Sequence, residues 1–169
     1  MNTPFLITFA GMVGTGKSTI AHYLSRNLLL PIFSTDMIRS EIAQDLGQFN
    51  QDEFLLRRNQ YLTQLINTKS NFILDASVDR EWQHYHQQLA QSGYRAFIIS
   101  LDYSPEKIRQ LYQAGHYTNG LDNFEKYQAD HQRFLTTFSD AVSLSLTDVD
   151  FPKRLPISLK ACQQWLISP

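Results

Sequence analysis

The chain has 169 residues, 43% of them hydrophobic and 18% charged, which fits one globular domain and excludes an intrinsically disordered chain. Fifteen Lys and Arg against sixteen Asp and Glu leave a net charge of -1, so the composition does not indicate a strongly basic surface for long nucleic acid. The one cysteine, Cys162, excludes a disulfide framework within the chain and favours a reducing compartment. The apolar runs of the chain are too short for a signal peptide, and too short to cross a bilayer, which takes about 20 residues. We therefore expect a cytoplasmic protein with no membrane partner.

Short apolar runs alternate with amphipathic stretches along the first half of the chain. Continuous apolar runs predict strands at 5–10, 31–33 and 72–75. Apolar residues at helical spacing predict helices over 17–28, from about 36, over about 52–67, and from about 82 to the glycine at 93.

The same alternation continues in the second half. It predicts strands at 96–101 and 142–146, and helices from 105, over 124–138 and over about 157–166, with a loop at 115–120. Strands that alternate with helices indicate βαβ units, so we expect a single α/β domain over 1–169 with a mostly parallel five-stranded sheet and helices on both faces. Ligands of such sheets bind beyond the carboxyl ends of the strands, here after residues 10, 34, 75 and 101.

A phosphate-binding motif follows the first predicted strand. Residues 11–18 read Gly-Met-Val-Gly-Thr-Gly-Lys-Ser and match G-x-x-x-x-G-K-S/T at every fixed position. Glycines let the backbone wrap a polyphosphate, and backbone N–H groups at the helix start attract its charge. Lys17 would reach the β- and γ-phosphates and Ser18 would bind Mg²⁺. The residues expected to hold ATP are Gly11, Val13, Gly14, Thr15, Gly16, Lys17, Ser18 and Thr19.

A second element follows the second predicted strand. Asp36 and Arg39 are three residues apart at the start of a predicted helix, so their side chains share one face beside the phosphate loop. A carboxylate there can orient the attacking hydroxyl, or Asp36 can simply cap the helix while Arg39 pairs on the surface.

With these two motifs the chain resembles the compact P-loop kinases, a group that includes polynucleotide 5′-kinase, zeta toxin, chloramphenicol phosphotransferase, and gluconate and shikimate kinases. The resemblance implies a P-loop NTPase fold with a short lid, placed at about 113–121. It implies that Asp36 takes the proton of the acceptor hydroxyl and that Arg39 holds an acidic group of the substrate. It also suggests that Arg57 or Arg58 holds an anionic acceptor, although a solvated helix face is the alternative.

The remaining polar candidates are weaker. Asp75 ends the third strand, where a carboxylate can hold Mg²⁺ through water or cap the following turn. The histidines show no metal-binding spacing, and His131 is interpreted as a partly buried structural residue.

The lid departs from the pattern of the similar kinases, which carry two arginines in the helix that enters it. Here only Arg109 stands in that helix, and it is predicted to swing toward the phosphates. In the same kinases the adenine packs against the segment after the last strand, which places it near 152–157.

We therefore expect an ATP- and Mg²⁺-dependent phosphotransferase that acts on a hydroxyl acceptor, either a small molecule or a nucleic-acid 5′-hydroxyl, as a monomer or weak dimer. A catalytically impaired ATP-binding regulator is the alternative. A GTPase is disfavoured because residues 119–122, Asn-Gly-Leu-Asp, lack the lysine of the guanine-reading N-K-x-D segment.

Overall fold

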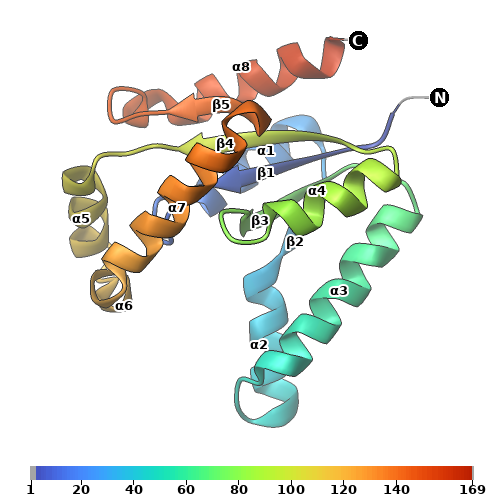
Figure 1. The fold of residues 1–169 in the computed structure, drawn as a ribbon, viewed down its shortest axis with the longest axis horizontal. Helices are drawn as coiled ribbons and strands as arrows, with labels where there is room; N and C mark the ends of the chain where they lie inside the picture. The colour runs from blue at the N-terminus through green and yellow to red at the C-terminus, as the bar shows by residue number, and fades with distance from the viewer. Residues whose placement is uncertain (1–2, 169) are drawn as a thin grey trace.

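The computed structural model describes residues 3–168, apart from the side chain of Asn119. Its sheet comprises β1 (Phe5–Ala10), β2 (Ile32–Ser34), β3 (Phe72–Ser77), β4 (Arg95–Leu101) and β5 (Val142–Leu146). Neighbouring strands pair in parallel in the order β2-β3-β1-β4-β5, so β1 is central and all five carboxyl ends lie at one edge of the sheet (Figure 1). The predicted parallel α/β fold is confirmed.

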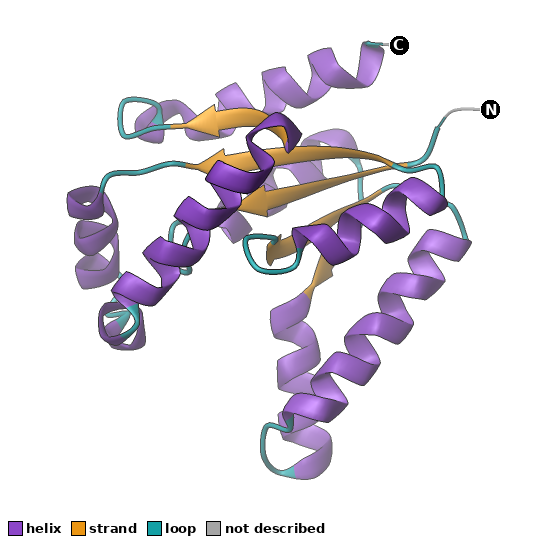
Figure 2. Ribbon diagram, viewed as in Figure 1, coloured by secondary structure: helices purple, strands orange, loops and turns teal. Residues whose placement is uncertain are grey.

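Helices cover both faces of this sheet (Figure 2). They are α1 (Lys17–Leu28), α2 (Thr35–Leu46), α3 (Gln51–Asn67), α4 (Trp82–Gln91), α5 (Pro105–Ala114), α6 (Thr118–Asp122), α7 (Phe124–Phe138) and α8 (Arg154–Ile167). Helices α1 and α8 pack on one face, and α3, α4 and α7 pack on the other. None of the helices within 3–168 is long and apolar enough to cross a membrane.

The alternation of side chains along β1 explains how both faces form a core. Ile7 packs with α1 and α8, whereas Leu6 packs with α3, α4 and α7. Both side chains are at most 1% exposed. A central parallel strand is buried on both faces, and this is why residues 5–10 form a continuous apolar run.

The predicted and observed elements differ at two places near the site. Residues 115–120 were expected to form a loop, but Thr118–Asp122 forms the short helix α6. A Cβ atom on Gly120 would lie 2.2 Å from the ring of Tyr117 and 2.7 Å from that of Tyr112, so two aromatic rings pack closely on this glycine of α6. Helix α8 begins at Arg154 rather than at 157, because Pro156 lies in its first turn, where backbone N–H groups have no helical partner.

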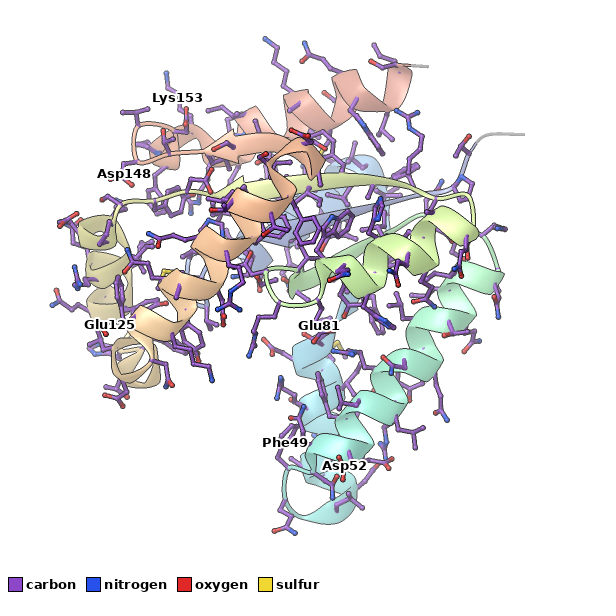
Figure 3. The ribbon with its side chains drawn as sticks, viewed as in Figure 1. Phe49, Asp52, Glu81, Glu125, Asp148 and Lys153 are labelled. Carbon is purple, nitrogen blue, oxygen red and sulfur yellow. The ribbon has the colours of Figure 1, made fainter. Side chains whose placement is uncertain are left out.

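Helices α2 and α3 form a hairpin that projects from the sheet. Figure 3 shows Phe49 and Asp52 near its tip, and Glu81 nearer the sheet, at the start of α4. The hairpin has its own small core, in which Ile38 and Ile42 of α2 pack with Phe54 of α3. The outer part of the hairpin thus has a core of its own beside the carboxyl edge of β2, while Leu62 and Ile66 of α3 pack on the sheet.

Candidate functional site

The phosphate loop joins the carboxyl end of β1 to α1 and depends on glycine at three positions. Gly11, Gly14 and Gly16 have φ angles of 133°, 76° and 95°, which side chains with a Cβ rarely adopt. Gly16 stands at the start of α1, and no side-chain hydrogen bond caps this helix start. The first N–H groups of α1 and its dipole therefore favour an anion at this end.

The other residues of the loop lie as follows. Thr15 is 1% exposed, and its hydroxyl donates to the carbonyl of Met12 at 2.8 Å. Val13 is half-buried and Thr19 is exposed. Thr15 thus stabilises the loop from within.

Lys17 carries the charge of this loop. Its ammonium donates to the carbonyl of Gly11 at 3.0 Å and to that of Met12 at 2.5 Å. Burial lowers the pKa of Lys17 to about 8, against the raising effect of three nearby carboxylates. These carboxylates belong to Asp79, Asp75 and Asp36. A half-buried cation therefore lies at the point where the carboxyl ends of β1, β2 and β3 meet.

Ser18 and Asp75 form a pair of oxygen donors beside Lys17. The Ser18 hydroxyl donates to Oδ1 of Asp75 at 3.1 Å, because β1 and β3 are neighbours in the sheet. Burial raises the pKa of Asp75, while the hydrogen bond from Ser18 opposes that shift. Residues 3–168 contain no group of three or more His, Cys, Asp or Glu side chains that could hold a metal ion. The pair fits Mg²⁺, a hard cation that commonly takes one or two protein oxygens and completes its shell with phosphate and water.

Asp36 and Arg39 lie at the start of α2, directly after β2. The Asp36 side chain is 87% exposed, and its Oδ1 lies 3.8 Å from Nε of Arg39. The Arg39 guanidinium lies over the ring of Phe54 at 4.2 Å and over that of Phe49 at 5.0 Å. The structure thus brings these two predicted residues together, with the carboxylate in solvent and the guanidinium over aromatic rings.

Arg57 and Arg58 both engage carboxylates of the chain itself. Arg57 pairs with Glu53 and with Asp45, each at 2.6 Å, and so connects α3 to α2. Arg58 is 6% exposed and pairs with Glu81 at 2.7 Å. In this conformation both guanidinium groups stabilise the hairpin and its junction with α4.

The segment predicted as a lid, 113–121, spans the end of α5 and most of α6, at the left of Figure 1, and α7 follows it. Arg109 of α5 lies over the ring of Phe124 of α7, with its guanidinium carbon 4.3 Å from the ring centre. Helix α5 contacts the phosphate loop through Tyr112, which is 1% exposed. A Cβ atom on Gly14 would lie 2.9 Å from the Tyr112 ring, so this ring packs directly on the loop.

Sequence reasoning missed a chain of side chains behind the phosphate loop. Asp79 accepts a hydrogen bond from the backbone N–H of Gly11, and His131 lies between Asp79 and Asp102. His131 is buried, as predicted, but its two carboxylate partners were not foreseen. The available signal was an aspartate shortly after each of β3 and β4, the two strands that flank β1.

Arg154 was also missed. Its side chain lies beside the loop, since a Cβ atom on Gly16 would be 4.0 Å from Arg154 Nε. Its guanidinium covers the ring of Phe151 at 4.2 Å, and Nη1 donates to the Phe151 carbonyl at 2.8 Å. Nε is buried without a hydrogen-bond partner among the described residues. This places a second cation beside the start of α1, in the segment predicted to hold the adenine.

Comparisons with known proteins agree with this geometry. Residues 6–140 match the family model described as AAA domain. No curated protein matches the chain significantly.

Several solved kinases share the fold over most of their length. APS kinase of Mycobacterium tuberculosis, solved with AMPPNP and APS, is 19% identical with a TM-score of 0.66, covering 96% of this chain and 99% of its own. Shikimate kinase of Aquifex aeolicus is 15% identical with a TM-score of 0.59, covering 96% and 99%. A gluconokinase of Sinorhizobium meliloti is 13% identical with a TM-score of 0.57, covering 98% and 95%.

The predicted resemblance to small P-loop kinases is confirmed at the level of the fold. Because the family model covers most of the chain and the phosphate loop has the expected geometry, the protein belongs to the AAA domain family of P-loop proteins.

Proposed function

We propose that the protein transfers the γ-phosphate of ATP to a hydroxyl acceptor with the help of Mg²⁺. One observation carries this proposal: the phosphate-loop lysine, an oxygen pair suited to Mg²⁺ and an exposed carboxylate meet at the carboxyl edge of three adjacent strands. Lys17, Ser18 with Asp75, and Asp36 supply these parts. The kinase fold of the similar structures supports the same reaction class.

Binding of the triphosphate would use the loop and its lysine. Lys17 would exchange the carbonyls of Gly11 and Met12 for β- and γ-phosphate oxygens, while loop N–H groups donate to the other oxygens. Ser18 and Asp75 would hold Mg²⁺, which would supply positive charge against the bound polyphosphate.

Transfer would depend on Asp36. The acceptor oxygen attacks the γ-phosphorus, the bond from that phosphorus to the bridging oxygen of ADP breaks, and the acceptor proton passes to the Asp36 carboxylate. Because Asp36 is 87% exposed, it can accept this proton without first breaking a buried contact. The carboxylate orients the hydroxyl in line with the leaving group.

We assign the acceptor to the space between α2 and the phosphate loop. Arg39 supports an acceptor that carries an acidic group, because its planar guanidinium suits carboxylates and phosphates. The similar kinase solved with AMPPNP and APS supports an acceptor of this kind, because APS carries acidic groups. The predicted role of Arg57 and Arg58 remains a prediction that requires exchange of their present carboxylate partners.

The adenine is proposed to lie near 152–157, against the start of α8. Arg154 supports this placement, because its guanidinium has a flat face and lies beside Gly16 at the start of α1. Guanidinium planes stack on aromatic rings, so Arg154 can stack on the base.

One observation favours the alternative of an impaired ATP-binding regulator. Arg109 is the arginine predicted to neutralise charge during transfer, and it is stacked on Phe124. If Arg109 stays there with ATP bound, the transferred γ-phosphate has no arginine from this helix to stabilise its negative charge, and transfer would be slow.

The test is a screen for ADP release with MgATP and three acceptor classes: hydroxylated metabolites, nucleosides, and oligonucleotides with a 5′-hydroxyl. The proposal predicts acceptor-dependent ADP release with one class and its loss in Asp36→Asn. Tight MgATP binding without acceptor-dependent release would favour the regulator.

A further inference from the structure

Helix α7 places one buried histidine between two carboxylates. His131 is 7% exposed; its Nδ1 lies 3.2 Å from Oδ1 of Asp79, and its Nε2 lies 2.9 Å from Oδ1 of Asp102. An ionised carboxylate only accepts hydrogen bonds, so both ring nitrogens must carry a proton for both contacts to be favourable. Burial alone would lower the pKa of His131, but the hydrogen bonds with Asp102 and Asp79 raise it to about 9.

Each carboxylate is bonded to a different part of the site. Both oxygens of Asp79 lie within hydrogen-bond distance of the Gly11 backbone N–H, at 3.1 and 3.2 Å. Asp102 accepts from the hydroxyls of Ser100 and Ser145 at the ends of β4 and β5. His131 therefore joins α7 to the first residue of the phosphate loop on one side and to the sheet edge on the other.

The position of Gly11 is sensitive to such a connection. Its φ of 133° is open to glycine, and a Cβ there would lie 3.1 Å from Leu101, so the loop starts against β4. The carbonyl of the same residue accepts from Lys17. A displacement of Gly11 would therefore also displace the lysine that is proposed to bind phosphate.

Helix α7 is also the exit of the lid. Phe124, at its first turn, contacts both Arg109 and Tyr112 of α5, and His131 lies two turns further along the same helix. Lid and phosphate loop thus share one rigid element, whose buried ionic contacts lie at His131.

We propose that His131 is a positioning residue that, through Asp79, holds the start of the phosphate loop in register with the lid helix. It touches no substrate in this role. The effect on the loop is a property of the free protein, whereas an effect on MgATP rests on the proposed function.

Other charged groups surround this contact. On α7 itself, Asp130 lies next to His131 and 3.6 Å from Arg133. From the turn after β3, Arg80 lies 3.8 Å from Asp130. From the phosphate loop, the ammonium of Lys17 interacts with Asp79. The two carboxylates that touch the ring directly are those of Asp79 and Asp102.

The test compares His131→Gln with the wild type by NMR, in the full chain without nucleotide. Amide exchange of Gly11 should accelerate by about tenfold or more, because the charge-assisted bond from Gly11 to Asp79 loses its orientation. The amides of Ile73 and Ile98, in the sheet core, serve as internal references and should change much less. His84→Gln, on the exposed side of α4, is the matched control and should change none of these rates.

The protonation state of the His131 imidazole is a second readout, and a role in packing alone would not affect it. In the wild type, the ring nitrogens of His131 should both be protonated at pH 7.5 and titrate near pH 9. Asp79→Asn should lower that pKa and accelerate Gly11 exchange, and it serves as the second variant if His131→Gln does not fold. A neutral His131 at pH 7.5, or exchange that rises equally in the core and at Gly11, would overturn the proposal.

A titration with MgATP separates this inference from the proposed function. His131→Gln should weaken MgATP binding by about tenfold or more, since small misplacements in a binding site have effects of this size. If the wild type itself fails to bind MgATP, the proposed function falls while the exchange experiment still decides the role of His131. If wild type and His131→Gln bind MgATP equally and exchange Gly11 equally, the inference is wrong.

Discussion

The phosphate loop and the lid differ in how their charged groups are held. In the loop, Lys17 donates to two carbonyls, and the first residue, Gly11, is bonded to Asp79. In the predicted lid, the exposed Arg109 side chain lies over the Phe124 ring, and a cation–π contact at an exposed site contributes only about 0.5–1 kcal/mol. The difference indicates that the phosphate loop is already arranged in the free protein, whereas Arg109 would have to leave Phe124 to take the role proposed for it.

Removing Arg109 tests this difference between the two regions most severely. Arg109→Ala should lower turnover by roughly 10³, the lower end of the effect of a transfer arginine, and leave MgATP affinity within about threefold. Steady-state kinetics with the identified acceptor and a MgATP titration measure the two quantities. Arg26→Ala, an exposed change in the last turn of α1, is the control.

Hydrogen exchange gives a second view of the same residue. MgATP should protect residues 109–121 if the lid closes over the phosphates. Wild-type turnover in Arg109→Ala, or no protection of this segment, would show that the lid does not supply the cation.

Asp36 tests the acceptor side. Asp36→Asn should lower transfer by about 10² or more, the usual contribution of a general base, while MgATP affinity and the unfolding midpoint stay the same. Stability should not change because the side chain is 87% exposed. Asp52→Asn, an exposed carboxylate at the start of α3, is the control. Near-wild-type transfer in Asp36→Asn would reduce Asp36 to a residue at the helix start.

Lys17 tests the loop. Lys17→Ala should weaken MgATP binding by about 10², since each hydrogen bond to a charged group contributes roughly 1.5–3 kcal/mol. Calorimetric titration measures the loss, with Lys160→Ala on the exposed part of α8 as the control. Unchanged affinity in a folded Lys17→Ala variant would contradict the site assignment.

The charge on Lys17 also predicts a pH dependence. Its pKa of about 8 means that the free protein loses this charge as the pH rises through 8, and phosphate binding must then restore the proton. MgATP affinity in wild type should therefore be constant from pH 6.5 to 7.5 and fall by up to about tenfold per unit above pH 8. The fall should be absent in Lys17→Met, and its persistence there would assign it to another group.

A separate prediction concerns the stability of the fold. The pKa of His131 is raised from 6.5 to about 9, so its ion pairs stabilise the fold fully below pH 6.5 and lose this contribution as the pH rises through 9. The free energy of unfolding of wild type, relative to His131→Gln, should fall by up to about 3 kcal/mol across this window. Urea unfolding at several pH values measures it, and a difference independent of pH would contradict a charged His131.

Local sequence pattern was sufficient to predict the elements that form the phosphate loop. The run at 5–10 and the glycine motif predicted β1, the loop and the start of α1 where the structure has them, because apolar alternation and backbone freedom act within a few residues. The position of Asp36 next to the site followed from the parallel sheet, whose carboxyl ends meet at one edge.

Contacts between residues far apart in the sequence could not be predicted from local pattern. His131 meets Asp79, which is 52 residues away, and Arg58 meets Glu81, which is 23 residues away, and no spacing rule connects such pairs. Likewise, 115–120 contains the residues of a turn, yet Thr118–Asp122 is helical and lies against α5, where the Tyr112 ring would be 2.7 Å from a Cβ atom on Gly120. Sequence pattern thus identified the elements, but not which charges they bring into contact.

In the proposed reaction, Asp36 acts on an acceptor hydroxyl while the phosphate loop binds MgATP independently. The most direct measurement follows the labelled γ-phosphate of ATP into product for wild type and Asp36→Asn, with MgATP affinity measured on the same samples. We predict a phosphorylated acceptor with wild type and at least about 10² less with Asp36→Asn at equal affinity. Equal product from both proteins, or no transfer to any acceptor class by a wild type that binds MgATP, would contradict the account.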